Sequence, residues 1–445
     1  MISPSIDLMD GRAVQLRRGR ELVLEGGDPL ERLQEFSVAG EVAVVDLDAA
    51  LGRGSNAALI REMVRQAPCR VGGGIRDVDS ALDWLDAGAA RVMIGTAASV
   101  EFCSQLPRER VIAAVDAEFG AIVVDGWRTR TGMGVIDRVA ELAPVVGGFL
   151  LTQVEHEGGM GGFDMALVQR ALDAAGDARV VAAGGITTTD DIAALDRAGA
   201  DAQVGMALYS GALSLGSAVA APLAKGLDDR LWATVVRDEA GLSLGLVWST
   251  RESLEAAVSQ RRGVYWSRSR DELWVKGESS GATQNLLRVD LDCDRDALCF
   301  TVRQAGTGFC HTGQRGCWPT PFGLSALGRT LQQRRDMVGD LNSGTARLFS
   351  DPALLRSKLL EEAAELSEAE TPSEVTHEAA DLIYFALVAA ARSGVSVEDI
   401  SGELGRRHQR VRRRAMVAKG TTNSTAQDAM NTVTKTALKV DGGGR

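Results

Sequence analysis

The chain contains few of the residues on which small secreted domains and nucleic-acid-binding proteins depend. It has 6 cysteines, 10 prolines and 4% aromatic residues in a length of 445. Six cysteines are too few for a disulfide framework in so long a chain. The formal net charge of −11 argues against a nucleic-acid scaffold, and we expect no nucleic-acid partner.

Long apolar runs are missing as well. No run reaches the ~18 residues of a membrane-spanning helix, and residues 1–4 are not typical of a signal peptide. We therefore expect a soluble, cytoplasmic protein without a membrane partner. Glycine, in contrast, is abundant at 50 residues, as expected of an α/β architecture with many tight turns. The length is sufficient for two to four domains.

Short apolar runs alternate with amphipathic helical segments from residue 1 to about residue 225. Such alternation predicts a parallel sheet, and the length suits a (β/α)8 TIM barrel. The clearest strand-like runs are residues 42–47, 91–94, 111–115, 149–151, 180–182 and 202–204.

This region contains an internal repeat. Residues 71–76 (Val-Gly-Gly-Gly-Ile-Arg) match residues 182–187 (Ala-Ala-Gly-Gly-Ile-Thr), and each copy continues through a helix to a second glycine turn. Asp7 and Asp116 end the first and fifth strand runs at nearly the same offset. We therefore predict a duplicated half-barrel.

The glycine clusters predict two phosphate sites, because strand ends that open helices present free backbone N–H groups to an anion. A single cluster would be an ordinary turn, but four in duplicate favour a substrate with a phosphate at each end. Asp7 and Asp116 would then face each other as a general acid–base pair. The candidate phosphate-binding residues are Gly73, Gly74, Arg76, Gly95, Thr96, Gly184, Gly185 and Gly205.

With residues 5–11, 45–50 and 125–127, these motifs make residues 1–225 resemble phosphoribosylformimino-aminoimidazole carboxamide ribotide isomerase. The imidazole glycerol phosphate synthase cyclase subunit shares the barrel but usually reads Cys-Leu-Asp where this chain reads Ser-Ile-Asp. The resemblance implies an Amadori rearrangement of an aminoaldose to an aminoketose. It makes Asp7 the general base and Asp116 the general acid, while Trp127 would stack on the substrate or serve only in packing.

The sixth strand departs from that family, which commonly has Thr-Asp followed shortly by Asp-Gly. This chain has Thr152-Gln153 and then Glu157-Gly158. We expect Thr152 to be retained in the site and Glu157 to replace the aspartate with a side chain one methylene longer. The departure leaves an alternative open, in which the barrel is a non-catalytic scaffold.

A second group of motifs begins at residues 292–296 (Asp-Cys-Asp-Arg-Asp), inside the strand-like run 286–302. Strand periodicity would place Asp292, Asp294 and Asp296 on one face. Three carboxylates so close together repel one another unless a hard cation such as Mg²⁺ lies between them. The alternative is a solvated acidic turn.

Three cysteines accompany the acidic motif. Cys293 would point from the opposite face of the strand, and Cys310 and Cys317 follow in a glycine-rich segment. Three thiolates suit Zn²⁺ and leave its fourth position open, which is typical of catalytic zinc. The alternative is a set of unrelated buried thiols.

With residues 263–270, 273–281 and 308–313, these motifs resemble phosphoribosyl-AMP cyclohydrolase over about residues 230–320. The resemblance implies hydrolytic opening of the six-membered ring of the adenine. It also implies a dimer that binds zinc through the three cysteines at the subunit interface and magnesium through the three aspartates. His311 would carry a proton or support the site structurally. Arg268 and Lys276 are candidate substrate-binding residues.

Residues 324–416 have a helical pattern, for which we predict four helices at 324–340, 352–370, 373–393 and 396–415. The second and third helices carry acidic side chains at spacings of three and four, which can converge on Mg²⁺ and hold a diphosphate. The candidate ligands are Glu361, Glu362, Glu365, Glu378 and Asp381. The alternative is a solvated acidic face with pairs such as Lys358–Glu362.

Residues 345–349, 358–365 and 378–384 make residues 324–415 resemble phosphoribosyl-ATP pyrophosphohydrolase, an all-α relative of the MazG-type pyrophosphatases. The resemblance implies cleavage of phosphoribosyl-ATP to phosphoribosyl-AMP and pyrophosphate by a dimer. Lys358 and Arg347 are candidate substrate-binding residues. A rival reading is a house-cleaning nucleotide pyrophosphatase with a structural zinc.

We thus predict a trifunctional histidine-biosynthesis enzyme that uses Zn²⁺ and Mg²⁺ and acts on small phosphoribosyl nucleotides. The predicted parts are a barrel at 1–226, an α+β metal-binding domain at 227–321, a MazG-like helical domain at 322–419 and a disordered tail at 420–445. A homodimer is expected through the second and third parts. The alternative is a bifunctional cyclohydrolase and pyrophosphohydrolase whose barrel is inactive.

Overall fold

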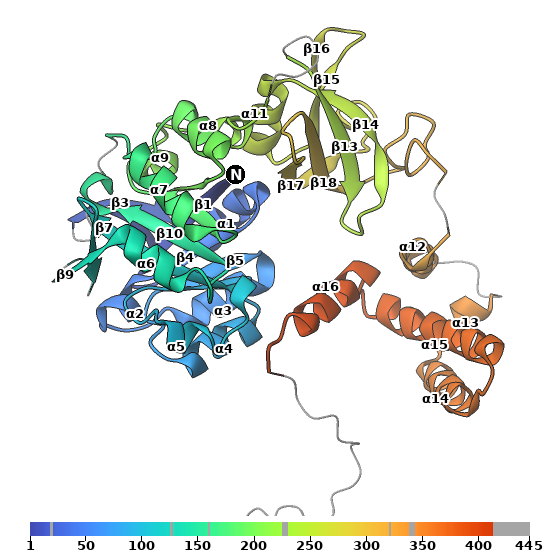
Figure 1. The fold of residues 1–445 in the computed structure, drawn as a ribbon. Coiled ribbons are helices and arrows are strands. Elements are labelled where there is room, and N and C mark those ends of the chain that lie inside the picture. Colours follow the sequence, from blue (N-terminus) through green and yellow to red (C-terminus); the bar gives the residue numbers. More distant parts are fainter. Residues whose placement is uncertain are drawn as a thin grey trace, which may run out of the picture. The chain divides into compact units, whose positions relative to one another are not determined.

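Eight parallel strands close into a barrel in the first half of the chain (Figure 1). The structure, a computed structural model, describes residues 1–17, 21–124, 127, 129–158, 161–224, 230–319, 322–337 and 343–412. The barrel closes because β7 pairs with β10 and β12 pairs with β1. Its strands are β1 (Ile2–Met9), β4 (Val42–Asp46), β5 (Cys69–Gly72), β6 (Arg91–Ile94), β7 (Val111–Glu118), β10 (Gly148–Gln153), β11 (Arg179–Ala183) and β12 (Asp201–Val204).

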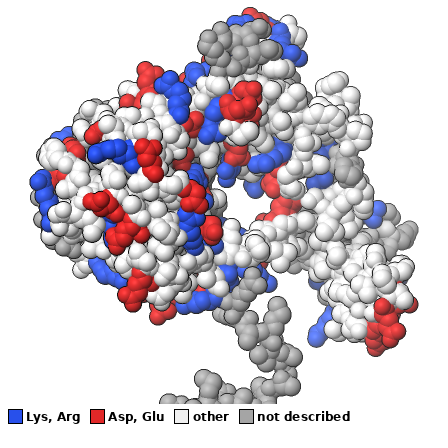
Figure 2. Space-filling view, viewed as in Figure 1, with Lys and Arg blue, Asp and Glu red and all other residues white. Residues whose placement is uncertain are grey.

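Helices follow every barrel strand, which confirms the predicted (β/α)8 architecture. They are α1 (Pro29–Phe36), α2 (Leu47–Leu51), α3 (Ala57–Gln66), α4 (Val78–Ala87), α5 (Val100–Cys103), α6 (Val135–Leu142), α7 (Met165–Ala175), α8 (Thr189–Ala198), α9 (Met206–Tyr209) and α10 (Leu215–Ala220). Buried Val, Ile, Leu and Ala side chains from strands and helices form the core between the two layers. Acidic and basic side chains are interspersed over the visible face of the barrel (Figure 2).

The two halves of the barrel share details that confirm the predicted duplication. Helix α4 begins with a capping box formed by Asp77 and Ser80, and α8 begins with one formed by Thr188 and Asp191. Both end at a left-handed glycine, with φ of 113° and 93° respectively. A residue without Cβ adopts this conformation at little cost. The two copies of the motif thus begin and end their helices by the same chemistry.

Each half also carries a hairpin that apolar periodicity did not predict. Strands β2 (Arg12–Arg17) and β3 (Glu21–Gly27) follow β1, and strands β8 (Ala121–Val124) and β9 (Thr129–Gly134) follow β7. Both hairpins extend the sheet beyond the strand that carries a candidate catalytic aspartate. Their outer strands are largely exposed, so their sequences lack the apolar alternation of a core strand.

A six-stranded sheet follows, in the order β16-β15-β14-β13-β18-β17. Its strands are β13 (Trp232–Asp238), β14 (Ser243–Ser249), β15 (Val264–Ser267), β16 (Glu272–Val275), β17 (Gln284–Leu291) and β18 (Ala297–Gln304), and helix α11 (Arg251–Gln260) accompanies them. Tyr265 and Phe300 fill its core, and the Tyr265 hydroxyl donates to Gln284 Oε1 at 2.6 Å. This arrangement is the α+β domain that the sequence predicts.

The expectation of one strand across residues 286–302 is wrong. Residues 292–296 form a tight turn between the antiparallel strands β17 and β18. The carboxylate of Asp292 accepts the backbone N–H groups of Asp296 and Ala297, each at 3.0 Å, and so closes the turn. Aspartate favours turns for this reason, and here that preference exceeds the strand propensity of the flanking residues.

The remaining described chain is helical, as predicted, with α12 (Leu324–Asp336), α14 (Pro352–Glu368), α15 (Pro372–Arg392) and α16 (Val397–His408). A further helix, α13 (Gly344–Ser350), was not predicted, because seven residues are too few for a clear apolar period. The predicted tail at 420–445 lies outside the described residues. No single described helix is long and apolar enough to cross a membrane, although α15 and α16, bent by 107°, pass that test of length and composition as a pair.

Candidate functional sites

A cavity of about 530 Å³ lies at the carboxyl ends of the barrel strands. Its volume is within the usual range for a small-molecule site. The carboxylates of Asp7, Asp116 and Glu157 line it, together with Thr152 and Trp127. Every predicted phosphate-binding residue lines it too: Gly73, Gly74, Arg76, Gly95, Thr96, Gly184, Gly185 and Gly205. Strands that are distant in sequence thus bring the predicted residues of the barrel into one site.

The three carboxyl groups of the cavity are shifted toward their neutral forms. Burial raises the pKa of Asp7 to about 7. Burial also raises the pKa of Asp116, although hydrogen bonds from Trp127 and Thr152 partly oppose this. Burial, reinforced by the charges of Asp7 and Asp116, raises the pKa of Glu157 to about 8. Asp7 and Glu157 thus titrate near neutral pH, where such groups can both accept and donate protons.

The two glycine clusters adopt the same backbone conformation. Gly73 and Gly74 have φ of 91° and 73°, and Gly184 and Gly185 have φ of 91° and 80°. A Cβ on Gly73 would lie 2.2 Å from the Asp46 carbonyl oxygen, and one on Gly185 would lie 2.0 Å from that of Gly162. Both the left-handed conformation and the close packing therefore require glycine. The clusters form two equivalent turns at the cavity.

Gln153, where this chain departs from the resembled family, holds a loop and does not face the cavity. Its side chain is buried, accepts the Asp164 N–H at 2.6 Å and donates to the Asp164 carbonyl at 3.1 Å. Asp46 ends the strand at the corresponding place in the other half and accepts the N–H of Asn56 at 2.7 Å. Each residue holds the N-cap residue of a helix in its half, Asp164 of α7 or Asn56 of α3, so glutamine occupies a supporting position.

Gln203 also lines the cavity and was not among the predicted site residues. Among the described residues, its buried Oε1 atom has no hydrogen-bond partner. The signal was present, since Gln203 is the one polar residue inside the apolar run 202–204. A buried acceptor without a partner is costly, and a bound molecule with a donor group would satisfy it.

The acidic turn brings together Asp292, Asp294 and Asp296, although the three do not share a strand face. One carboxylate oxygen from each lies within 4.8 Å of the others. The charge of Asp294 raises the pKa of Asp296. Burial raises the pKa of Asp292, but hydrogen bonds from Ala297 and its neighbours outweigh this and lower it. Three oxygen donors at such separations fit a hard divalent cation.

The predicted zinc ligands are only partly assembled within one chain. The Cys310 and Cys317 thiols interact with each other, and Thr312 donates to Cys310 Sγ at 3.1 Å. This hydrogen bond lowers the pKa of Cys310, whereas burial raises the pKa of Cys317. Cys293 is exposed on the acidic turn and joins no group of three ligands among the described residues. One chain therefore offers a pair of thiols and a separate third.

Lys276 is buried beside that thiol pair. Burial lowers the pKa of Lys276, while the charges of Cys317 and Cys310 oppose the change. Its ammonium lies 5.6 Å from the centre of the Phe309 ring. The other predicted residues of this region are exposed: Arg268 stacks on Trp248 at 4.5 Å, and His311 is next to Cys310 in the loop. Lys276 thus belongs with the thiols, which the sequence did not indicate.

On the helices, three of the five predicted acidic ligands converge. Carboxylate oxygens of Glu362, Glu365 and Glu378 lie within 4.8 Å of one another, and Glu362 is buried. Burial and the charge of Glu378 raise the pKa of Glu365. The other two predicted ligands, Glu361 and Asp381, are not in this group.

Those two acids have other partners. Glu361 accepts from Lys358 at 2.8 Å, and Asp381 lies 3.6 Å from His377. Residue 361 is turned about 100° from residue 362 around the helix axis, so it cannot share the same face. Lys358 also contacts Glu362 at 3.4 Å and therefore borders the acidic group, whereas Arg347 is exposed on α13.

Three family models match the chain in succession. The model described as histidine biosynthesis protein matches residues 1–214, that of phosphoribosyl-AMP cyclohydrolase matches residues 245–319, and that of phosphoribosyl-ATP pyrophosphohydrolase matches residues 324–408. The first contains the cavity, the second the acidic turn and the cysteines, and the third the converging glutamates.

Curated relatives carry similar descriptions. An imidazole-4-carboxamide isomerase of Methanocorpusculum labreanum is 37% identical over 235 residues, which are 49% of this chain and 98% of the relative. A histidine biosynthesis bifunctional protein of Schizosaccharomyces pombe is 48% identical over 192 residues, 43% of this chain and 46% of the relative. A trifunctional protein of Saccharomyces cerevisiae is 45% identical over 192 residues, 43% of this chain and 24% of the relative. The chain thus spans less than half the length of these bifunctional and trifunctional proteins.

Proposed function

The chain belongs to the imidazole-4-carboxamide isomerase family of histidine biosynthesis, and from this premise we propose that it is a multifunctional enzyme of that pathway. Its helical domain would cleave phosphoribosyl-ATP to phosphoribosyl-AMP and pyrophosphate. Its second domain would open the adenine ring, and its barrel would isomerise the product. The observation that carries the proposal is the assembly of a separate acidic or thiol site inside each of the three matched regions.

In the barrel, the two glycine turns would hold the two phosphates of the aminoaldose. Asp116, whose pKa burial raises, would donate a proton to the sugar ring oxygen and open the sugar ring. Asp7, with a pKa of about 7, would remove the proton from C2 of the open-chain imine. The enol so formed becomes the ketose when C1 gains a proton and the C2 hydroxyl loses one. Glu157, with a pKa of about 8, would remain mostly neutral at pH 7 and donate a hydrogen bond.

In the second domain, Cys310 and Cys317 would supply two thiolates and Cys293 of a second copy the third. Thiolate sulfurs suit zinc, which supplies a hydrolytic nucleophile at neutral pH when bound. The separation of Cys293 from the other two thiols within one chain supports the homodimer. Lys276 would offset the negative charge of the thiolates, and the acidic turn would hold magnesium.

In the helical domain, the glutamates of α14 and α15 would hold magnesium and leave positions open for the diphosphate of the substrate. The two thiols and the three glutamates fit zinc and magnesium by their donor atoms, which are sulfur in one site and oxygen in the other. Glu362 is the central candidate for a magnesium ligand, because a buried carboxylate needs a nearby positive charge. Lys358, at 3.4 Å, supplies only part of that charge.

A coupled assay tests the proposal. The purified full-length chain, supplied with Zn²⁺ and Mg²⁺, should convert phosphoribosyl-ATP through to the ketose. Cys317→Ser should stop the sequence at phosphoribosyl-AMP, and Asp7→Asn should make the aminoaldose accumulate. At limiting Mg²⁺, Glu378→Gln should slow the sequence before phosphoribosyl-AMP. If the wild-type chain accumulates the aminoaldose, the barrel is a scaffold, as in the alternative reading. Hydrolysis of ordinary nucleoside triphosphates without ring opening would favour the house-cleaning reading.

A further inference from the structure

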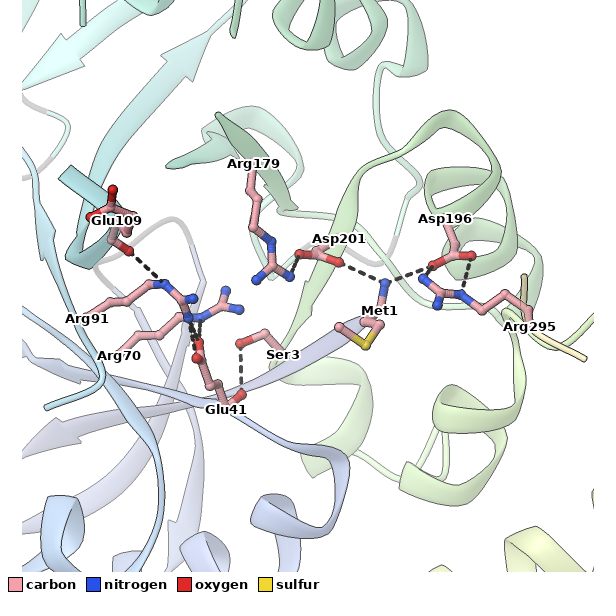
Figure 3. A network of polar contacts seen from close by, with 10 residues as sticks. All are labelled: Met1, Ser3, Glu41, Arg70, Arg91, Glu109, Arg179, Asp196, Asp201 and Arg295. Atoms are coloured by element: carbon pink, nitrogen blue, oxygen red, sulfur yellow. Dashed lines mark hydrogen bonds and ion pairs between the residues drawn. The ribbon is translucent and has the colours of Figure 1, made fainter. Parts of the chain in front are cut away.

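The acidic turn of the second domain contacts the barrel through the side chain of Arg295. Arg295, which lies between Asp294 and Asp296, makes a bidentate contact with Asp196 of α8 (Figure 3). Its Nε atom lies 3.1 Å from Asp196 Oδ2, and its Nη2 atom lies 3.0 Å from Oδ1. A planar guanidinium matches a carboxylate in this way with fixed direction as well as distance.

The same arginine is held on its other sides. Its Nη1 atom donates to the Asp292 carbonyl at 2.7 Å, and its own carbonyl accepts the N–H of Ala224 at 2.9 Å. Its backbone is left-handed, with φ of 66°. Residues other than glycine rarely adopt this conformation without support from their surroundings. The contacts of Arg295 therefore help to fix the conformation of the turn.

Asp196 belongs to a charged network at the end of the barrel opposite the cavity. The amino group of Met1 lies 2.9 Å from Asp196 and 2.8 Å from Asp201, which also pairs with Arg179 (Figure 3). The Asp196 side chain is only 11% exposed. An ion pair so shielded from water is screened less than one on the surface, so it directs geometry more firmly.

The three turn carboxylates repel one another whenever no cation lies between them. A free hairpin would relieve this by spreading apart, and a cation would then have to reorder it on binding. A turn that other contacts already fix loses less conformational entropy when the cation binds. Asp196 of the barrel binds Arg295 and so fixes its position in the turn. The carboxylates of Asp294 and Asp296, on either side of Arg295, therefore stay close together.

We propose that Asp196 of the barrel is a positioning residue for the divalent cation of the second domain: through Arg295 it preorganises the turn that carries Asp292, Asp294 and Asp296. The inference rests on the proposed magnesium site. It gives the barrel a second role, as the support of a neighbouring metal site, that is independent of chemistry in its cavity.

Two measurements on the full-length chain test this role. In a Glu378→Gln background, which weakens the helical site, Mn²⁺ titration followed by electron paramagnetic resonance reports binding at the turn. Asp196→Asn should weaken it about tenfold, and Asp196→Glu, which keeps the charge, should restore most of it. Asp190→Asn, an exposed change in the first turn of the same helix, is the matched control and should bind like the parent. Isomerase activity should be unchanged in all of them and so verifies folding.

Hydrogen exchange without metal provides the second readout. The amides of Asp296 and Ala297, which close the turn, should exchange faster in Asp196→Asn than in Asp190→Asn. Equal exchange and equal Mn²⁺ affinity in these two variants, with a wild-type chain that binds Mn²⁺, would overturn the positioning role alone. A wild-type turn that binds no Mn²⁺ would instead contradict the proposed metal site and with it the role of Asp196 toward the metal.

Discussion

Thr152 and Asp116 lie directly opposite each other on the paired barrel strands β10 and β7, and the Thr152 hydroxyl donates a hydrogen bond to the Asp116 carboxylate. This bond stabilises the charged form of the acid and so limits the rise of its pKa. The proposed general acid is thus tuned by a residue on the neighbouring strand.

Thr152→Val should remove this hydrogen bond and raise the pKa of Asp116. Because a general acid must be protonated to act, the alkaline limb of the isomerase pH profile should move to higher pH. Measurement of kcat/KM from pH 6 to 10 tests this, with the exposed helical change Thr376→Val as the control. An alkaline limb in the same place for both variants would show that Asp116 is not the acid.

Asp7→Asn should lower the isomerase rate by about 10²-fold or more, since a general base typically contributes that much. The wild-type kcat/KM should fall as pH drops through the Asp7 pKa of about 7, because the protonated carboxyl cannot accept a proton. Opening of the adenine ring and release of pyrophosphate, assayed on the same sample, are the internal control. An unchanged isomerase rate would support the scaffold reading.

The same variant should alter stability in a pH-dependent way. A carboxyl group whose pKa is raised in the folded state, from 3.8 to about 7, favours folding at pH below about 4 and loses that contribution as pH rises to 7. Asp7→Asn should therefore unfold at higher urea concentration than wild type at pH 8 but not at pH 4. If the urea midpoints of the two proteins differ by the same amount at pH 4 and pH 8, Asp7 is not a buried ionisable group.

Mixing experiments should reveal whether the zinc site spans two chains. Cys293→Ser and Cys317→Ser chains should each lack cyclohydrolase activity. Because a twofold site would take Cys293 from one chain and the thiol pair from the other, a refolded equal mixture should recover about a quarter of wild-type activity. Zinc content should recover in parallel. A mixture that remains inactive while both chains are folded would contradict the shared site.

Gly185→Ala should weaken substrate binding strongly, with an isomerase KM raised about tenfold or more. The added Cβ would lie 2.0 Å from the Gly162 carbonyl oxygen and must displace the turn. Gly176→Ala is a matched control, because Gly176 also has positive φ, 62°, but has open space around its Cβ position. Equal effects of the two changes would mean that backbone strain alone, and not the shape of the turn, is responsible.

Glu378→Gln should raise the Mg²⁺ concentration needed for pyrophosphate release by about tenfold, since it removes one of three converging carboxylates. Glu368→Gln on α14 is the control, because Glu368 is exposed and outside the group. Pyrophosphate release measured against Mg²⁺ concentration distinguishes them. If both variants require the same Mg²⁺ concentration as wild type, the glutamate group does not hold the metal.

Sequence reasoning succeeded for the barrel because its signals are local and repeated. The glycine clusters and aspartates stand at strand ends, and parallel strands bring their carboxyl ends together, so the shared cavity follows from topology. It failed where a single turn decides geometry: a run rich in strand formers contains the hairpin turn at 292–296. The apolar run 202–204 marks Gln203 as its one polar residue, but only the folded barrel shows that its buried Oε1 atom has no partner among the described residues.

On the helices, spacing identified five candidate acids but not their partners. Glu362 and Glu361 are neighbours in sequence, yet one is buried in the acidic group and the other pairs with Lys358. The rotation of each helix about its axis separates them, and packing against α15 sets that rotation. Helical periodicity assigns a residue to one face of its helix but does not identify the residues that pack against that face.

The sequence by itself determined the barrel, its duplication and the order of the three regions, because these depend on local pattern and on the rule that strand ends meet. Only the tertiary structure decided which acids converge, that Cys293 is separate from the other two thiols, and that Arg295 reaches Asp196. Such contacts depend on the packing of segments distant in the chain, and no local pattern encodes it.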